Sequence, residues 1–296
     1  MSASAAETVL VLEGGGLRGA FVAGALAEFE RAGLRFSHIF ATSAGAASAA
    51  YLLAGQIEGA LRIWNDRTHG GQLISPLHLL RGRGLMDIAG LVRVFEGELD
   101  ARGLAGSQTK LSVTVTNCNT GRADHVAVTE HNVFPLLRAT MALPVVYGRV
   151  VDVEGVPYID GGITDAIPFE AALALSPRRV IVVTTRPLGY RKVKRFGGDL
   201  LRYNYRAYPE LWPALRNRWE SYNRTVGKLE AFERLGRVEV IRPVAALPAS
   251  RMTRDRGRIM QTLELGRSAV LAFLGPSAAG RASSSVVGGQ ALRESA

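Results

Sequence analysis

The chain has 296 residues, which is long enough for one large α/β domain or two small ones. Its hydrophobic content of 47% suits a sizeable core and excludes a mostly disordered chain. Lysine and arginine total 36 against 26 acidic residues, and the net charge of +10 points to an anionic partner, either nucleic acid or a membrane surface. Because Cys118 is the only cysteine, no intrachain disulfide can form, which excludes a secreted disulfide scaffold.

The first predicted elements alternate between strand and helix. Residues 8–12 are a short apolar run typical of a buried strand, and the glycines at 14–16 interrupt it. The apolar spacing predicts a helix over 17–32, a second buried strand over 38–41 and a second helix over 44–55. This repeated strand–turn–helix order indicates a parallel sheet with helices packed on its faces.

Later segments predict the remaining elements. Strands are expected at residues 111–116, 125–128, 145–153, 157–159, 179–184 and 238–241. Helices are expected at residues 87–99, 169–175, 211–235 and 256–274.

We expect one domain over 1–275 and a disordered tail over 276–296. The N-terminal residues lack signal-peptide features, and the longest uncharged run, 40–57, is too polar to span a membrane, so a cytoplasmic protein is expected.

A glycine-rich turn, Gly14–Gly19, lies between the first predicted strand and a helix N-terminus. Glycines there allow a tight turn and present backbone amides to an anion or a developing oxyanion. The segment also satisfies the dinucleotide-binding pattern G-x-G-x-x-G, but no acidic residue occurs between Arg31 and Ile57 to hold a ribose. A P-loop is excluded because no Lys-Ser/Thr pair follows. The alternative is that the glycines only shape a turn.

Ser43 lies in Ala41-Thr42-Ser43-Ala44-Gly45, at a predicted strand-to-helix turn. A serine between small residues at such a turn is the nucleophile-elbow arrangement, in which any bulky flank would clash. The usual first glycine of the elbow is Ala41 here, and Gly45 is the second. Alternatively, Ser43 is only a helix N-cap.

The sequence favours a carboxylate as the direct partner of Ser43. All five histidines precede residue 132, so none follows Asp160 as the usual hydrolase order would require. A Ser–Lys pair of S-x-x-K type is excluded because position 46 is alanine. Asp160 lies at a predicted strand end before two glycines, although Asp-Gly is also an ordinary turn dipeptide. Asp165 is expected to cap the following helix instead.

The order of these motifs resembles the patatin-like phospholipase family, whose members are serine acyl hydrolases with a Ser–Asp dyad and no histidine. The resemblance covers about Val9 to Thr185 and includes the segment 138–144, in which Thr140 occupies a position where serine is commoner. It implies an α/β fold: a three-layer α/β/α sandwich with a mainly parallel central sheet.

Carried over to this chain, the resemblance gives Ser43 as the nucleophile and Asp160 as its base. The backbone amides of the Gly14, Gly15 and Gly16 turn, with Arg18 nearby, would form the oxyanion hole. Loops at the carboxyl ends of adjacent parallel strands would bring these groups together. The implied substrate is a lipid ester, either a phospholipid or a lysophospholipid, with no cofactor. The histidines and Cys118 show no metal-ligand spacing, so no metal is expected.

A basic, aromatic stretch covers residues 178–224, with twelve Lys/Arg against three acids. Basic residues interleaved with Tyr and Trp suit peripheral contact with an anionic membrane. The alternative is a solvated helical face over the core. Nucleic acid is not expected, because no DNA- or RNA-binding motif accompanies the stretch.

Two other functions remain open at this point. One is a carboxylesterase for small soluble esters, which would share Ser43 and Asp160. The other is a non-catalytic lipid- or membrane-docking protein, which Ala41 and the basic stretch 178–224 would favour. The motifs do not specify the acyl chain, the headgroup or the oligomeric state.

Overall fold

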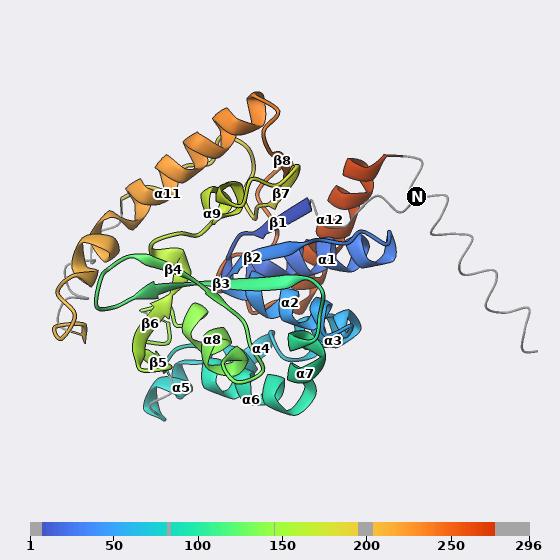
Figure 1. Ribbon diagram of the computed structural model, residues 1–296. Coiled ribbons are helices and arrows are strands. Elements are labelled where there is room, and N and C mark those ends of the chain that lie inside the picture. Colours follow the sequence, from blue (N-terminus) through green and yellow to red (C-terminus); the bar gives the residue numbers. More distant parts are fainter. Residues whose placement is uncertain (1–7, 82–83, 145, 195–203, 276–296) are drawn as a thin grey trace, which may run out of the picture.

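The computed structural model describes residues 8–81, 84–144, 146–194 and 204–275 (Figure 1). These residues form one eight-stranded sheet. Its strands are β1 (Thr8–Leu12), β2 (His38–Thr42), β3 (Lys110–Asn117), β4 (Ala123–Ala127), β5 (Val151–Val153), β6 (Val156–Asp160), β7 (Arg179–Val183) and β8 (Glu239–Ile241).

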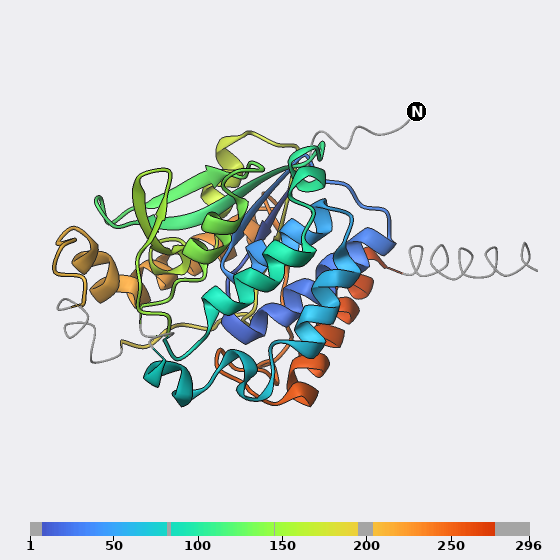
Figure 2. The same ribbon diagram turned by 90° about the horizontal axis from the view of Figure 1, so that it is seen from below.

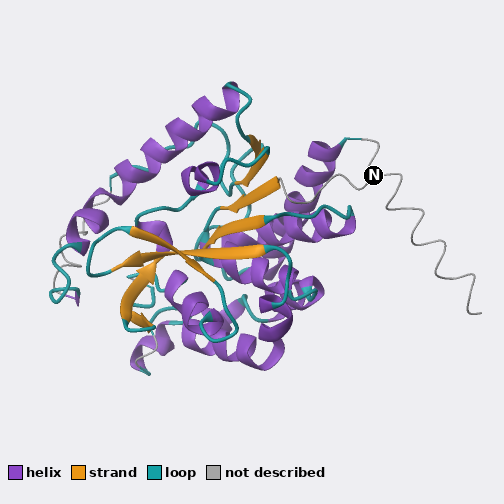
Figure 3. Cartoon of the chain, viewed as in Figure 1, coloured by secondary structure: helices purple, strands orange, loops and turns teal. Residues whose placement is uncertain are grey.

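Helices cover both faces of the sheet (Figure 3). They are α1 (Ala20–Arg31), α2 (Ala44–Leu53), α3 (Ile57–Asp66), α4 (Gly70–Leu73), α5 (Pro76–Leu80), α6 (Ile88–Glu98), α7 (Ala101–Ala105), α8 (Val133–Thr140), α9 (Phe169–Ala174), α11 (Leu211–Arg234) and α12 (Arg256–Leu274), with short 3-10 turns η2 (Gly16–Gly19) and η3 (Gly161–Ile163). The predicted three-layer α/β/α architecture is therefore confirmed.

The sheet is parallel at its centre. Its order is β5-β6-β3-β2-β1-β7-β8, and the neighbours from β3 to β8 pair in parallel. Alternate residues of β1 enter opposite cores: Leu10 and Leu12 join the cluster beneath α1 and α12, while Val9 and Val11 join the cluster beneath α9 and α11. Burial on both faces explains why β1 is a continuous apolar run.

Three strands meet along β3 in a way that determines the site. On one edge of β3, β2 pairs as far as Thr42 with Thr114, and β6 takes the next position, Asp160 with Val115. The hairpin partner β4 overlaps both pairings and so occupies the opposite edge. Because β2 is parallel and β6 antiparallel to β3, these two strands point toward each other and their carboxyl ends meet.

Helices α1 and α12 lie side by side although they come from opposite ends of the described chain (Figure 2). Their backbones approach at two glycines. A Cβ atom on Gly24 would lie 2.0 Å from the Leu263 carbonyl oxygen, and one on Gly266 would lie 2.0 Å from the Phe21 carbonyl oxygen. Glycine is therefore required at both positions, since any side chain would force the helices apart.

Most predicted strands are confirmed within two residues. Of the strand predicted over 145–153, only Val151–Val153 is confirmed; the prediction is wrong for residues 146–150, and residue 145 lies outside the described residues. Before β5 the backbone turns instead: the amides of Tyr147 and Gly148 donate to the Leu143 carbonyl, and Gly148 has φ +71°. Helices α3, α4, α5, α7 and α8 were not predicted from the sequence; in α8, proline occurs within the helix. Its Pro135 is tolerated because it lies in the first turn, where backbone amides lack helical acceptors.

The basic, aromatic stretch 178–224 is only partly a surface feature. Tyr205 and Tyr222 are 1% and 5% exposed, so they are core residues and not interfacial ones, whereas Trp212 is 37% exposed. Peripheral membrane contact through this stretch stays a prediction. Residues 195–203 of this stretch, and the tail predicted over 276–296, lie outside the described residues.

None of the helices that the structure describes is long and apolar enough to cross a membrane.

Candidate active site

Ser43 lies at the sharp turn between β2 and α2. Its backbone has φ 54° and ψ −128°, a conformation that residues other than glycine rarely adopt. The hydroxyl of Thr140 holds this turn: Ser43 N donates to Thr140 Oγ1 at 2.8 Å, and Thr140 Oγ1 donates to the Thr114 carbonyl at 2.7 Å. Thr140 thus connects the strained residue to β3.

Small residues surround the turn because the space is narrow. A Cβ on Gly14 would lie 2.9 Å from the Ser43 Cβ, and one on Gly45 would lie 3.2 Å from the Glu13 carbonyl oxygen. Ala41 is fully buried and is not among the described residues with positive φ, so its methyl group causes no backbone strain. Alanine is therefore compatible with the elbow at this position.

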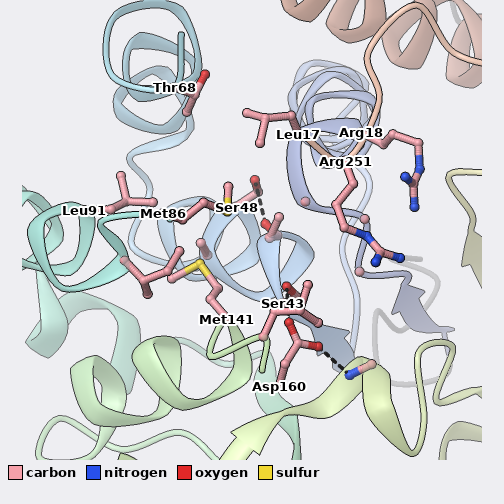
Figure 4. A pocket seen from close by; sticks show the side chains of 18 of the residues that line it. Leu17, Arg18, Ser43, Ser48, Thr68, Met86, Leu91, Met141, Asp160 and Arg251 are labelled. Atoms are coloured by element: carbon pink, nitrogen blue, oxygen red, sulfur yellow. Dashed lines mark hydrogen bonds between the residues drawn. The ribbon is translucent and has the colours of Figure 1, made fainter. Parts of the chain in front are cut away.

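Asp160 ends β6 and faces Ser43 (Figure 4). Its Oδ2 accepts a hydrogen bond from Ser43 Oγ at 3.2 Å, and its Oδ1 accepts one from the Gly162 amide at 2.8 Å. A Cβ on Gly161 would lie 2.1 Å from the Thr114 carbonyl oxygen, so glycine is needed for the chain to turn against β3. Both carboxylate oxygens are thus oriented by hydrogen bonds.

The approach of Ser43 and Asp160 differs from the expected geometry in one respect. We expected the two loops to follow adjacent parallel strands, but β6 is antiparallel to its neighbour β3. The two residues meet because β2 and β6 run end to end along β3.

Opposing effects set the pKa of Asp160. Burial raises it because a desolvated carboxylate is disfavoured, while Arg218, the Gly162 amide, Arg251 and the Ser43 hydroxyl lower it. Cations close to the site therefore help to keep a buried carboxylate ionised and able to accept a proton.

No histidine is among the described residues that line the cavity at Ser43. His125 lies elsewhere, with its Nε2 3.6 Å from Asp165 Oδ2. Burial lowers the pKa of His125 and raises the pKa of Asp165 to about 6. The expectation that Asp165 caps the next helix is wrong, because α9 begins at Phe169 and its N-cap is Pro168.

The glycine-rich turn borders the same cavity. The Gly14 amide donates to the Ala166 carbonyl at 3.4 Å, whereas the amides of Gly15 and Gly16 have no acceptor among the residues described. Gly16 has φ +58°, which favours glycine. Three glycines were expected to form the oxyanion hole. The backbone amides of Gly15 and Gly16 are available to donate to a ligand, whereas Gly14 contributes by having no side chain that would collide with Ser43.

Two buried charged residues support this turn. Glu13, 1% exposed, accepts hydrogen bonds from the Thr185 amide and hydroxyl and, at 2.9 Å, from the Tyr222 hydroxyl. Arg18 is also buried, and its Nε has no hydrogen-bond partner among the residues that the structure describes. Burial, together with Arg186, lowers the pKa of Arg18 to about 10. Glu13 was not predicted from the sequence, although a carboxylate directly after an apolar strand is a usable signal.

The cavity has a volume of about 970 Å³, part of it open to solvent, and its two sides differ. Many of the lining side chains are apolar; they include Tyr51, Ile63, Trp64, Met86, Leu91, Phe95 and Met141. In Figure 4, Met86, Leu91 and Met141 lie on one side of Ser43, and the guanidinium groups of Arg18 and Arg251 lie on the other. The apolar side is suited to a hydrocarbon chain.

Comparison with known proteins identifies the family of the chain. The model of the family described as "Patatin-like phospholipase" matches residues 10–173. The chain belongs to the patatin-like phospholipase family. The residues that match this family of lipid acyl hydrolases include both Ser43 and Asp160. A second model, a domain of unknown function (DUF6363), matches residues 208–276, which include α11 and α12.

Two individual proteins are similar to this patatin-like chain. An uncharacterized Escherichia coli (strain K12) protein, YjjU, is 30% identical over 203 residues. The match covers 64% of this chain and 57% of that relative, so the chain spans little more than half of the relative's length. VipD from Legionella pneumophila aligns structurally with a TM-score of 0.41 and 16% identity, over 89% of this chain and 67% of VipD.

Proposed function

We propose that the protein is a serine lipid acyl hydrolase in which Ser43 is the nucleophile and Asp160 its general base, with no histidine. The observation that carries this proposal is the 3.2 Å contact between Ser43 Oγ and Asp160 Oδ2 at the wall of a largely apolar cavity. A hydroxyl that donates to a buried carboxylate can transfer its proton directly as it attacks. Family membership supports the same class of reaction.

The reaction would proceed in two halves. Ser43 Oγ attacks the ester carbonyl while its proton moves to Asp160, and the resulting oxyanion accepts hydrogen bonds from the amides of Gly15 and Gly16. The intermediate collapses, the C–O bond to the alcohol breaks, and the alcohol leaves with the proton from Asp160. Asp160 then takes a proton from water, whose oxygen attacks the carbonyl carbon of the acyl-serine. As the C–O bond to Ser43 breaks, Asp160 returns this proton to Ser43 Oγ, and the fatty acid is released.

The shape of the cavity favours a long acyl chain over a small soluble ester. Aromatic and aliphatic side chains line much of the cavity, and Met86, Leu91 and Met141 lie on the same side of Ser43. Burying a methylene group there contributes about 0.8 kcal/mol, so each added carbon should increase kcat/KM until the cavity is filled. A carboxylesterase for small soluble esters would show no such increase. A series of monomeric and micellar nitrophenyl esters distinguishes the two functions.

Labelling with a fluorophosphonate, followed by intact mass and peptide mapping, tests the nucleophile. We expect a single adduct on Ser43 and none in Ser43→Ala. The absence of an adduct on folded wild-type protein would contradict the proposal and favour the lipid-docking function. That alternative also predicts liposome binding that Ser43→Ala leaves unchanged, with no ester hydrolysis.

A further inference from the structure

The side of the cavity opposite the apolar wall is unusually cationic. Lys192, Arg218 and Arg251 line it together with Arg18. Within the described residues, no carboxylate forms an ion pair with any of these four. The cavity's acidic residues are already engaged: Glu13 accepts hydrogen bonds from Thr185 and Tyr222, and Asp160 accepts them from Ser43 and Gly162.

Five contacts hold three of these residues, Lys192, Arg218 and Arg251, in place. Arg218 Nε donates to the Gly162 carbonyl at 2.9 Å, directly beside Asp160. The Lys192 backbone forms a reciprocal pair of hydrogen bonds with the Asn223 side chain, and its ammonium lies 3.5 Å from the centre of the Tyr222 ring. The Arg251 carbonyl accepts the Leu17 amide at 3.2 Å, which attaches Arg251 to the glycine-rich turn.

Keeping these charges together is costly, although Asp160 and Glu13 offset part of their repulsion. Burial, and after it Arg251, lowers the pKa of Arg218 to about 10. Burial, followed by Arg218, holds the pKa of Lys192 well below its usual range. Groups that repel one another inside a partly desolvated cavity are stabilised by an anion that accepts hydrogen bonds from several of them.

We propose that Lys192, Arg218 and Arg251 form a subsite for the phosphate of a lipid headgroup. Figure 4 shows Arg251 across Ser43 from Met86, Leu91 and Met141. Lys192 and Arg218 interact electrostatically with Arg251, so one ligand could place its acyl chain on one side of Ser43 and its phosphate on the other. This inference rests on the proposed function, because it names the substrate of the same site. That substrate is an acyl ester that carries a phosphate a few bonds from the scissile ester.

The subsite gives a role to the part of the chain outside the patatin-like match. Lys192 follows β7, beyond residue 173 where that match ends. Arg218 on α11 and Arg251 before α12 both fall within residues 208–276, the segment matched by the domain of unknown function. We infer that this segment supplies headgroup recognition to a catalytic centre built by the first part of the chain.

A pair of substrates with the same acyl ester tests the subsite: 1-oleoylglycerol 3-phosphate and 1-oleoylglycerol. Wild-type protein should favour the phosphorylated ester by roughly 10- to 100-fold in kcat/KM, the range expected for charge-assisted hydrogen bonds. Lys192→Gln should reduce that ratio about tenfold or more, mainly through KM. The matched control is Lys194→Gln, which removes the same charge from an exposed side chain outside the cavity and should preserve the ratio. Equal kcat/KM values for the two esters in wild-type protein would overturn the subsite while leaving the proposed hydrolysis intact.

A binding measurement separates the subsite from catalysis. Calorimetric titration of Ser43→Ala with dodecyl phosphate, dodecanol and inorganic phosphate should show the tightest binding for dodecyl phosphate. The double variant Ser43→Ala/Lys192→Gln should bind it about tenfold more weakly or worse. This result would support the subsite even if wild-type protein hydrolysed no ester. Inorganic phosphate binding as tightly as dodecyl phosphate would overturn the headgroup assignment, because it would indicate a site for free phosphate.

Discussion

Ser43 and Asp160 meet where β2 and β6 end on the same edge of β3. Thr42 pairs with Thr114, and Asp160 pairs with the next residue, Val115. The separation of the two functional side chains is therefore set by the backbone of a buried central strand, and Ser43 Oγ lies 3.2 Å from Asp160 Oδ2 without an intervening residue. A contact built on rigid elements is the type of preorganisation that catalysis requires.

Removing the nucleophile should abolish turnover without unfolding the protein. Ser43→Ala deletes only the hydroxyl, and in a serine hydrolase this change lowers kcat by about 10⁴-fold or more. Hydrolysis of a nitrophenyl ester, with circular dichroism to verify the fold, measures the effect. Turnover close to that of wild-type protein would exclude Ser43 as the nucleophile.

Asp160→Asn should lose most activity because an amide cannot accept the proton of Ser43. His125→Gln is the matched comparison, since His125 is partly buried but does not line the cavity. It should keep wild-type turnover in the same assay. A His125 variant that is folded but inactive would contradict a dyad without histidine.

Activity should decrease on the acidic side at a higher pH than for an ordinary aspartate. Only ionised Asp160 can accept a proton, and burial raises its pKa, so the active fraction falls as the pH drops through that raised value. Arg218 lowers the pKa of Asp160, so Arg218→Gln should move the acidic limb of the kcat/KM profile to still higher pH. Arg216→Gln, at an exposed position on the same helix, should leave the limb where it is. A shift toward lower pH in Arg218→Gln would contradict this electrostatic account.

Thr140 should act as a positioning residue through its hydroxyl. Thr140→Val leaves the Ser43 amide and the Thr114 carbonyl without their partner, at a cost of about 1–3 kcal/mol for each buried group. We expect roughly 10- to 100-fold lower kcat, because the elbow would no longer be held in place. Thr140→Ser keeps the hydroxyl and should restore kcat. Urea unfolding and steady-state kinetics measure both effects, and equal kcat for the two variants would refute the role.

The contact between α1 and α12 should tolerate no side chain. Gly24→Ala places a methyl group 2.0 Å from the Leu263 carbonyl oxygen, and overpacking of this kind costs about 1–3 kcal/mol or more. Gly227→Ala, in α11, is the control: nothing lies within 4 Å of its new Cβ, and alanine should stabilise that helix by about 0.5–1 kcal/mol. Urea unfolding of the two variants should therefore show shifts of opposite sign. A stabilising Gly24→Ala would mean that the helices can move apart freely.

Local motifs account for what could be predicted from the sequence. Ser43 and Asp160 each stand beside small residues at a strand end, and the apolar runs of β1 and β7 are readable without any tertiary information. Lys192, Arg218 and Arg251 show no such pattern, because they come from three separate segments that only the folded chain brings to one cavity. The end-to-end arrangement of β2 and β6 could not be predicted from the sequence either, because the direction of a strand in a sheet depends on its pairing with strands that are distant in the chain.

The contacts of the glycine-rich turn and of α1 limit where the chain could be cut into fragments that fold separately. The Leu17 amide bonds to the Arg251 carbonyl, and Gly24 of α1 packs directly on the backbone of α12. The limit of sequence similarity at residue 173 is therefore no boundary of folding. A fragment cut there would lose a neighbour of its glycine-rich turn, so we predict that the two matched segments unfold in one cooperative transition.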